Sequence, residues 1–292
     1  MLLKRWDVIN DNFISVSSKL IFNITLPALI FLKVSSLDSN NPVPFDVVGV
    51  IYTVTIGVFV ITWAFATRWV KAGASLGAFM QGSYRGNFAT VGLAASAGVY
   101  GLEGLSQAAL LLAFVVPLYN VLGVVALVVP LSKGRQLSRV RLFKEIFLNP
   151  IVLAVFIALP FSYFGVTLPS IVQNTGNYLA ELTIPLGLIG VGGALQFASR
   201  SYSFAHALNA SLVKIILMPA VGVVVALLCG FDSQTIGILF ILFACPTTMA
   251  TFIMAQAMGA DDKLASAIVV ISTCLSAITM LVGLFFLQAI LQ

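Results

Sequence analysis

Charged residues are scarce in this chain. Only 9% of its 292 residues are charged and 60% are hydrophobic, with a mean hydropathy of +1.08, which is far more apolar than a soluble domain. The net charge of +5 does not indicate nucleic-acid binding, because many of the cations crowd one short loop: Lys133, Arg135, Arg139, Arg141 and Lys144. We therefore expect a polytopic protein whose partner is the lipid bilayer, with no nucleic acid.

Histidine, cysteine and buried acids are also scarce. The one histidine, His206, is expected in a loop, and the three cysteines lie singly within or at the ends of apolar runs. This spacing predicts no metal site, disulfide framework or cofactor. No Asp or Glu falls in the middle of an apolar run, which leaves an intramembrane protease without its catalytic groups and disfavours a cation/proton antiporter. We expect a protein that is not an enzyme.

Nine apolar runs are long enough to span a bilayer, and each must be helical because lipid offers the backbone no hydrogen-bond partner. They cover Ser15–Ser35, Val47–Ala66, Ala74–Ala97, Leu105–Val129, Ile146–Phe164, Leu179–Phe197, Ala207–Leu228, Ile236–Met258 and Leu264–Leu287. The positions of Lys and Arg predict a multi-pass protein of the cell (inner or plasma) membrane, with its N-terminus cytoplasmic and its C-terminus extracellular or periplasmic. The loop Ser132–Glu145 is then a cytoplasmic anchor or a short interfacial helix.

An internal repeat emerges when the chain is shifted against itself by about 158 to 160 positions. Leu20–Pro27 then faces Tyr178–Pro185, with the two prolines in register. Because the second half holds an odd number of runs, the halves are predicted to lie in opposite orientations, as in the inverted repeats of secondary transporters. The counterpart of Ile146–Phe164 would precede Trp6, so a first helix is missing. A truncation, a misplaced start and a true nine-span protein all remain open.

Two runs carry interruptions at equivalent places of the repeat. The segment Gly82–Gly92 contains an arginine, an asparagine and several glycines, and Phe243–Thr251 contains Pro246. We expect two broken helices that meet at the middle of the membrane. Broken helix ends expose N–H groups and a partial positive charge, which together suit an anion.

The candidate binding residues lie in and near these interruptions. Asn87 is expected to donate its amide to a carboxylate, and Arg85 either pairs with that carboxylate or pins the crossover to freed carbonyls. Thr247 and Thr248 either line the site or bond back to the preceding turn. Asn120 is expected in the middle of a span, where its amide needs a hydrogen-bond partner, and its neighbour Tyr119 is expected to pack against other side chains. Elsewhere, Lys214 is expected to snorkel to the inner surface, and Glu181 to be an exposed carboxylate at a helix start.

Five stretches in order resemble the auxin efflux carrier family, which includes plant PIN-FORMED carriers and bacterial malate or malonate permeases. They are Leu26-Pro-Ala-Leu-Ile, Arg85-Gly-Asn-Phe, Pro117-Leu-Tyr-Asn, Pro185 to Leu195 and Cys245 to Asp261. The resemblance implies a sodium/proton-antiporter-like (bile-acid-symporter-like) fold with two broken crossover helices. It also implies a scaffold domain (1–45 and 146–200) and a transport domain (46–131 and 201–292), joined by the basic loop 132–145. A homodimer through the scaffold domain fits the same plan.

The resemblance and the residues together predict an elevator-like carrier of a small organic anion, such as a mono- or dicarboxylate. The expected site comprises Arg85, Gly86, Asn87, Tyr119, Asn120, Pro246, Thr247 and Thr248. Plant relatives have a proline where this chain has Gly86 and a serine where it has Ile30, so auxin itself is not assumed. The alternatives are a sodium- or proton-coupled symporter of another anion and a membrane receptor or assembly subunit that does not transport.

Overall fold

The computed structural model describes residues 8–35, 45–71, 73–132, 144, 147–194 and 202–291. Over these ranges the chain is helical, and its one extended pairing is an isolated antiparallel bridge between Gly86 and Thr247. The expected all-helical class is confirmed. The helices are α2 (Asp11–Leu20), α3 (Leu26–Ser35), α4 (Phe45–Ala66), α5 (Ala74–Tyr84), α6 (Leu93–Ser132), α8 (Pro150–Tyr163), α9 (Ser170–Glu181), α10 (Thr183–Ala194), α11 (Tyr202–Leu212), α12 (Met218–Leu228), α13 (Ser233–Ala244), α14 (Ala250–Met258) and α15 (Asp262–Leu291), with π-helical turns η1 (Ile21–Thr25), η2 (Phe88–Gly92) and η3 (Val213–Leu217).

Five helical stretches of the described chain are long and apolar enough to cross a membrane: Asn12–Leu32, Phe45–Ala66, Glu103–Ser132, Phe204–Leu228 and Asp262–Ala289. The apolar helices Phe88–Gly101, Pro150–Tyr163 and Ser233–Ala244 are shorter. Two of the expected spans are divided, one into α5 and the start of α6, the other into α13 and α14. The figure of nine crossings stays a prediction.

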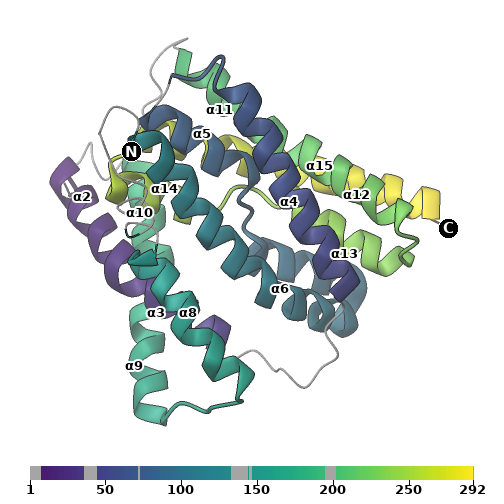
Figure 1. Ribbon diagram of the computed structural model, residues 1–292, viewed down its shortest axis with the longest axis horizontal. Coiled ribbons are helices and arrows are strands. Elements are labelled where there is room, and N and C mark those ends of the chain that lie inside the picture. The colour runs from purple at the N-terminus through teal and green to yellow at the C-terminus, as the bar shows by residue number, and fades with distance from the viewer. Residues whose placement is uncertain are drawn as a thin grey trace.

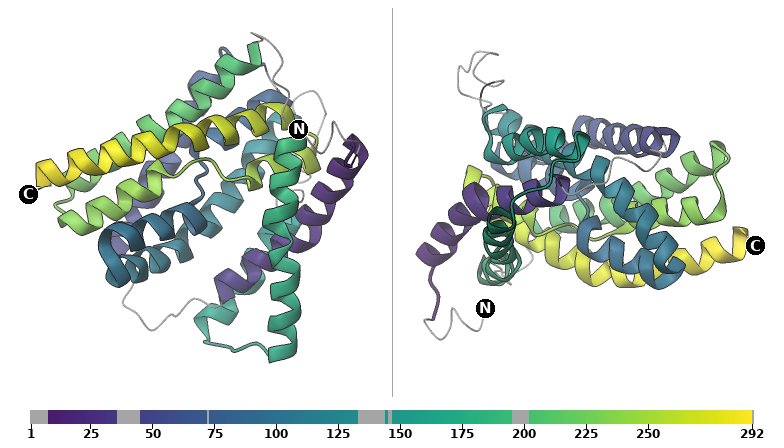
Figure 2. Two further views of the ribbon diagram at one scale, coloured as in Figure 1. Left: turned by 180° about the vertical axis from the view of Figure 1, so that it is seen from behind. Right: turned by 90° about the horizontal axis from the view of Figure 1, so that it is seen from below.

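The helices form two groups that meet along one side (Figures 1 and 2). One group holds α2, α3, α8, α9 and α10, and the other holds α4, α5, α6 and α11 to α15. Across the boundary, α14 packs against α2, and α10 packs against α15. The two broken helices lie together in the larger group.

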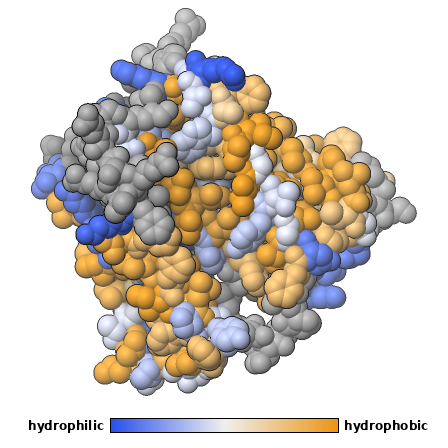
Figure 3. All heavy atoms as spheres, viewed as in Figure 1, coloured by the Kyte–Doolittle hydropathy of each residue, from blue (hydrophilic) through white to orange (hydrophobic). Residues whose placement is uncertain are grey.

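Apolar side chains cover most of the face in Figure 3, with hydrophilic residues gathered toward its margins. Large exposed hydrophobic residues lie on the outer helices, for example Ile56, Val60 and Ile61 on α4 and Leu281 and Phe285 on α15. In water such a surface would be costly, whereas in a bilayer it is the lipid-facing surface.

Helix ends outside the apolar layer are capped by side chains. Asn10 Oδ1 accepts from Phe13 N at 2.8 Å, and Asn149 Oδ1 accepts from Ile151 N at 3.0 Å where Pro150 opens α8. Asp232 caps α13, accepting from Thr235 N at 3.0 Å and from the Thr235 hydroxyl at 2.7 Å. These bonds, led by that of the Thr235 hydroxyl, lower the pKa of Asp232 below its usual value.

Two expectations need adjustment. The run predicted as Leu179–Phe197 belongs to a longer helical stretch, because α9 already begins at Ser170 and continues into α10. The run predicted to end near Ala97 continues as α6, which is interrupted at Gly101, where φ is 65°. The basic loop lies outside the described residues except for Lys144, which is helical.

Candidate functional site

The two broken helices cross at their breaks and are joined there by backbone hydrogen bonds. The α5 helix ends at Tyr84 and η2 begins at Phe88, while α13 ends at Ala244 and α14 begins at Ala250. Asn87 N donates to Pro246 O at 2.8 Å, and Thr248 N donates to Arg85 O at 3.3 Å. The groups freed by each break are therefore partly satisfied by the other break, as buried backbone requires.

Side chains complete this junction. The Thr247 hydroxyl donates to Gly82 O at 2.8 Å, so it satisfies a carbonyl in the last turn of α5. Thr247 N donates to the Ser272 hydroxyl on α15 at 3.0 Å. Pro246 has no N–H to leave unpaired and fixes its own φ, which suits the extended turn between the half-helices.

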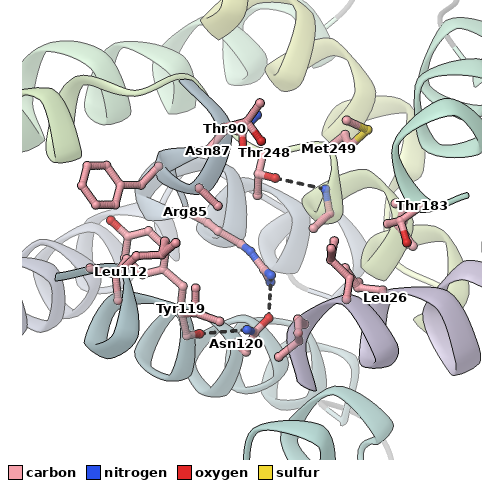
Figure 4. A pocket seen from close by; sticks show the side chains of 18 of the residues that line it. Leu26, Arg85, Asn87, Thr90, Leu112, Tyr119, Asn120, Thr183, Thr248 and Met249 are labelled. Carbon is pink, nitrogen blue, oxygen red and sulfur yellow. Dashed lines mark hydrogen bonds between the residues drawn. The ribbon is translucent and has the colours of Figure 1, made fainter. Parts of the chain in front are cut away.

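Arg85 reaches from the crossover to α6 (Figure 4). Its side chain is 5% exposed. One guanidinium nitrogen donates to Asn120 Oδ1 at 2.6 Å and the other to Met254 Sδ at 2.7 Å. Asn120 is held in turn, because its amide donates to Val116 O at 2.8 Å. The arginine thus does pin structural elements together, although through side chains of α6 and α14 rather than through freed carbonyls.

The guanidinium fits this place because Gly123 has no side chain. A β-carbon added at Gly123 would lie 2.7 Å from Arg85 Nη1, inside normal contact distance. The partners of the guanidinium are a neutral amide and a thioether. In the part of the chain that the structure describes, no carboxylate pairs with Arg85.

Beside Arg85 lies a cavity of about 330 Å³. Its walls come from both helix groups (Figure 4). The lining residues are Leu26, Leu29, Ile30, Arg85, Gly86, Asn87, Phe88, Ala89, Thr90, Leu112, Val115, Val116, Tyr119, Asn120, Asn177, Ala180, Glu181, Thr183, Thr248, Met249, Ala250 and Ile253. The volume is at the lower end of the range for small-molecule sites, and a mostly apolar lining with a few convergent polar groups is typical of them.

Both second half-helices begin at this cavity. Phe88 to Thr90 start η2, and Met249 and Ala250 start α14; all five line the cavity. The first N–H groups of a helix have no partner within it, and that end carries a partial positive charge. Asn87 precedes η2, and its side-chain amide makes no cap bond to it. Asn87 lines the cavity, and its side chain is not used as a cap of η2.

Most of the predicted site residues come together here. Arg85, Gly86, Asn87, Tyr119, Asn120 and Thr248 line the cavity, whereas Pro246 and Thr247 do not. Thr247 bonds across the junction instead of to its own preceding turn, and Thr248 Oγ1 accepts from Ala250 N at 3.5 Å. The Tyr119 ring packs edge-on against Tyr84, with 5.7 Å between ring centroids, which agrees with the packing role expected of it.

The structure adds Met254 to the site and corrects the expected placement of Glu181 and His206. Met254 gave no signal, because a methionine in an apolar run is unremarkable by sequence. Glu181 is exposed as expected but ends α9 rather than starting a helix, and it lines the cavity. His206 lies in α11 and is buried instead of standing in a loop.

Lys214 is the largest correction. It is fully buried in η3, so it does not snorkel to the inner surface. A charged residue with apolar neighbours on both sides is a sequence signal for a functional position, and the buried position of Lys214 agrees with that signal rather than with snorkelling.

Comparisons with known proteins agree with this architecture. The chain is 23% identical over 283 residues to an uncharacterized transporter of Methanothermobacter thermautotrophicus, covering 96% of this chain and 91% of the relative. It is also 23% identical over 279 residues to an uncharacterized transporter of Methanocaldococcus jannaschii, covering 94% and 89%. A sequence model of the family described as membrane transport protein matches residues 132–284, just over half of the chain. The chain therefore belongs to the membrane transport protein family, that of the auxin efflux carriers, as its sequence motifs indicated.

Proposed function

We propose that this protein is a secondary transporter that carries a small organic anion, such as a mono- or dicarboxylate, through the site at the helix crossover. One observation carries the proposal: the buried guanidinium of Arg85 lines the cavity and contacts only neutral partners among the described residues. A buried cation without a counter-ion is costly. An anionic substrate would supply the missing charge.

The chemistry of Arg85 favours a planar anion. A guanidinium has five N–H donors, and the two contacts to Asn120 and Met254 leave donors over. Carboxylates pair with arginine through two parallel hydrogen bonds. Asn87, the Thr248 hydroxyl and the starts of η2 and α14 add neutral donors to the same cavity, so a carboxylate can be bound without a second contacting cation.

The remaining lining suits the carbon skeleton of such a substrate. Leu26, Leu29 and Ile30 come from the smaller helix group, and Leu112 and Val115 come from α6. Ile30 makes this wall apolar at the place where plant relatives have a serine. Glu181 lines the cavity as an exposed carboxylate, and by like-charge repulsion it disfavours a second negative charge near it.

The cavity walls are shared between the two helix groups, which supports an elevator-like cycle. In the proposal, residues 1–45 and 146–200 form the scaffold and can dimerise, while 46–131 and 201–292 form the moving transport domain. The crossover lies within the transport domain, so the substrate moves with it past α2 and α10. The proposal includes nine crossings, an inverted repeat and a cytoplasmic N-terminus, because broken helices at a repeat interface are typical of such carriers.

Uptake into proteoliposomes tests the function. The panel comprises malate, malonate, other short carboxylates and indole-3-acetate, each with separate proton and sodium gradients. We expect at least one anion to be transported, with uptake reduced at least about 100-fold in Arg85→Gln and about tenfold in Asn87→Ala. Asn23→Ala is the matched control, because Asn23 is an exposed amide that bonds only to Lys19 O of its own helix.

The outcomes separate the alternatives. Binding of an anion without flux would indicate a receptor, whereas normal flux in both site variants would refute the proposed site. Dependence of uptake on one of the gradients would identify the coupling ion.

Orientation is tested by cysteine labelling in a background without the native cysteines. Glu103→Cys is expected to react with an impermeant maleimide from outside the cell and Lys263→Cys only after permeabilisation. The reverse pattern would contradict the assigned topology.

A further inference from the structure

Lys214 is a second buried cation at the crossover. Its side chain is 0% exposed, and its ammonium group donates to Phe243 O at the C-terminal end of α13. It does not line the cavity. The end of α13 carries a partial negative charge from its freed carbonyls, which gives the ammonium group a favourable place.

Local backbone structure brings Lys214 to this position. Lys214 lies in η3, a π-helical turn between α11 and α12. Such a turn inserts an extra residue into the helix and is often found at functional sites. The helix therefore directs a charged residue inward in a sequence stretch that is otherwise apolar.

Gly86 provides the space that Lys214 occupies. A β-carbon added at Gly86 would lie 2.9 Å from Lys214 Cε and 3.0 Å from Nζ, and 3.4 Å from Cys245 Cβ. Any residue with a β-carbon at position 86 would therefore press on the end of the lysine side chain. Gly86 itself lines the cavity, whereas Lys214 does not. The ammonium group therefore packs against a backbone residue of the cavity wall.

Lys214 has no carboxylate partner among the residues that the structure describes. Its ammonium group donates to the backbone carbonyl of Phe243, and the buried Cys245 also packs against Gly86. Of the elements packed against η3, α5 ends beside Arg85, another cation. The crossover therefore carries two buried positive charges and no buried negative one within the described chain.

We propose that Lys214 is a positioning residue that supplies the second positive charge of the anion site, acting through the Gly86–Asn87 backbone without touching the substrate. This inference rests on the proposed transport of an anion. An anion bound in the cavity acts as counter-ion to Arg85 by contact and to Lys214 at a distance. In an interior of low dielectric constant, such a separated charge still contributes to affinity.

The test compares wild type, Lys214→Met and Lys214→Arg in the uptake assay, with Lys19→Met as the control at an exposed lysine. Lys214→Met keeps an unbranched side chain, one atom shorter than lysine, and removes the charge. We expect its half-saturation concentration for the transported anion to rise at least about tenfold with a smaller change in maximal rate, and Lys214→Arg to restore most of the affinity. Thermal shift in detergent with the same anion provides a second readout of binding.

The outcomes are distinct. An unchanged half-saturation concentration in a folded Lys214→Met protein would overturn this inference alone. Loss of maximal rate with unchanged affinity would also overturn it, because it indicates a structural role. If the wild type neither binds nor transports any anion of the panel, the proposed function fails and this inference fails with it.

A double-mutant cycle tests the contact between Gly86 and Lys214. Gly86→Ala is expected to reduce affinity at least about threefold by displacing the ammonium group, whereas Gly86→Ala combined with Lys214→Ala should be no worse than Lys214→Ala alone. Equal effects of Gly86→Ala in both backgrounds would show that the two residues act independently and would count against the proposal.

Discussion

Thr183 donates a hydrogen bond to Thr25 through their hydroxyl groups, at 2.9 Å, and the two residues are 158 positions apart. That separation is the offset at which the two halves of the chain align. Equivalent residues of two repeats meet in this way when they lie near a two-fold axis. The contact is compatible with the inverted repeat, which stays a prediction, and it joins α10 to η1.

The threonine pair should stabilise the protein. Both side chains are buried, so Thr25→Val or Thr183→Val is expected to lower the free energy of unfolding by about 1 kcal/mol through loss of the bond. Because each variant removes the same bond, the double variant should lose less than the sum of the two. Thermal unfolding in detergent measures all four proteins, and strict additivity would show that the bond contributes nothing.

Asn120→Asp should inhibit transport while preserving the fold. The substitution places a carboxylate at the position of the amide oxygen that now accepts from Arg85 at 2.6 Å. The resulting ion pair neutralises the guanidinium, so anion uptake should fall at least about tenfold. The melting temperature should stay equal or rise. Uptake at the wild-type rate would show that the charge of Arg85 does not serve the substrate.

Substitution of Thr247 should chiefly lower stability, whereas substitution of Thr248 should chiefly affect transport. The Thr247 hydroxyl bonds to Gly82 O across the junction, and Thr248 lines the cavity. Thr247→Val is expected to cost about 1 to 3 kcal/mol of stability because it leaves a buried carbonyl without its partner. Thr248→Val should affect chiefly the half-saturation concentration. Melting curves and uptake of both variants test this assignment. Normal stability of Thr247→Val together with a destabilised Thr248→Val would contradict it.

Glu181→Gln should change which anions are preferred. Its carboxylate lines the cavity and is exposed to solvent, so its effect on a charged substrate is screened. Removing it should favour a dicarboxylate over a monocarboxylate of similar length by about two- to fivefold in half-saturation concentration. Competition uptake with malonate and a short monocarboxylate measures the ratio of their half-saturation concentrations. An unchanged ratio would show that Glu181 does not influence the choice between the two anions.

The cap of α13 should make the stability of the protein depend on pH. Asp232 has a lowered pKa because it accepts bonds from Thr235. Its contribution is therefore fully present above the unfolded-state pKa of about 3.9 and is lost as pH falls through the lower folded-state pKa. Asp232→Ala should cost about 1 kcal/mol at neutral pH. The difference in melting temperature from wild type should shrink below pH 4, and a constant difference would argue against the cap.

The sequence predicted the apolar helices and the interruptions well because each has a local cause. Long apolar runs leave a backbone no alternative to helix in lipid, and Pro246 and Gly86 mark the two breaks without reference to the rest of the fold. The partner of each break followed from the repeat, and the structure brings Asn87 and Pro246 into contact. The orientation of the repeats and the number of crossings stay predictions.

The side-chain partners could not be predicted. Met254 and Asn120 lie far from Arg85 in sequence, and their contacts depend on how α6 and α14 are rotated about their axes. The position of Lys214 in its apolar run predicts snorkelling, but the lysine is buried, and the π-helical turn in which it lies has no sequence pattern of its own. Thr247 and Thr248 are neighbours, and only three-dimensional structure distinguishes the one that ties the junction from the one that faces the cavity.

The bonds that join the two breaks lie within a single helix group, so none of them would have to break in the proposed elevator-like movement of that group. In the proposed cycle the substrate moves together with the larger helix group. The energy barrier to this movement arises where the groups meet, for example at the contact between α14 and α2. Bilayer thickness and lipid order should therefore change the transport rate while leaving the affinity for the substrate unchanged.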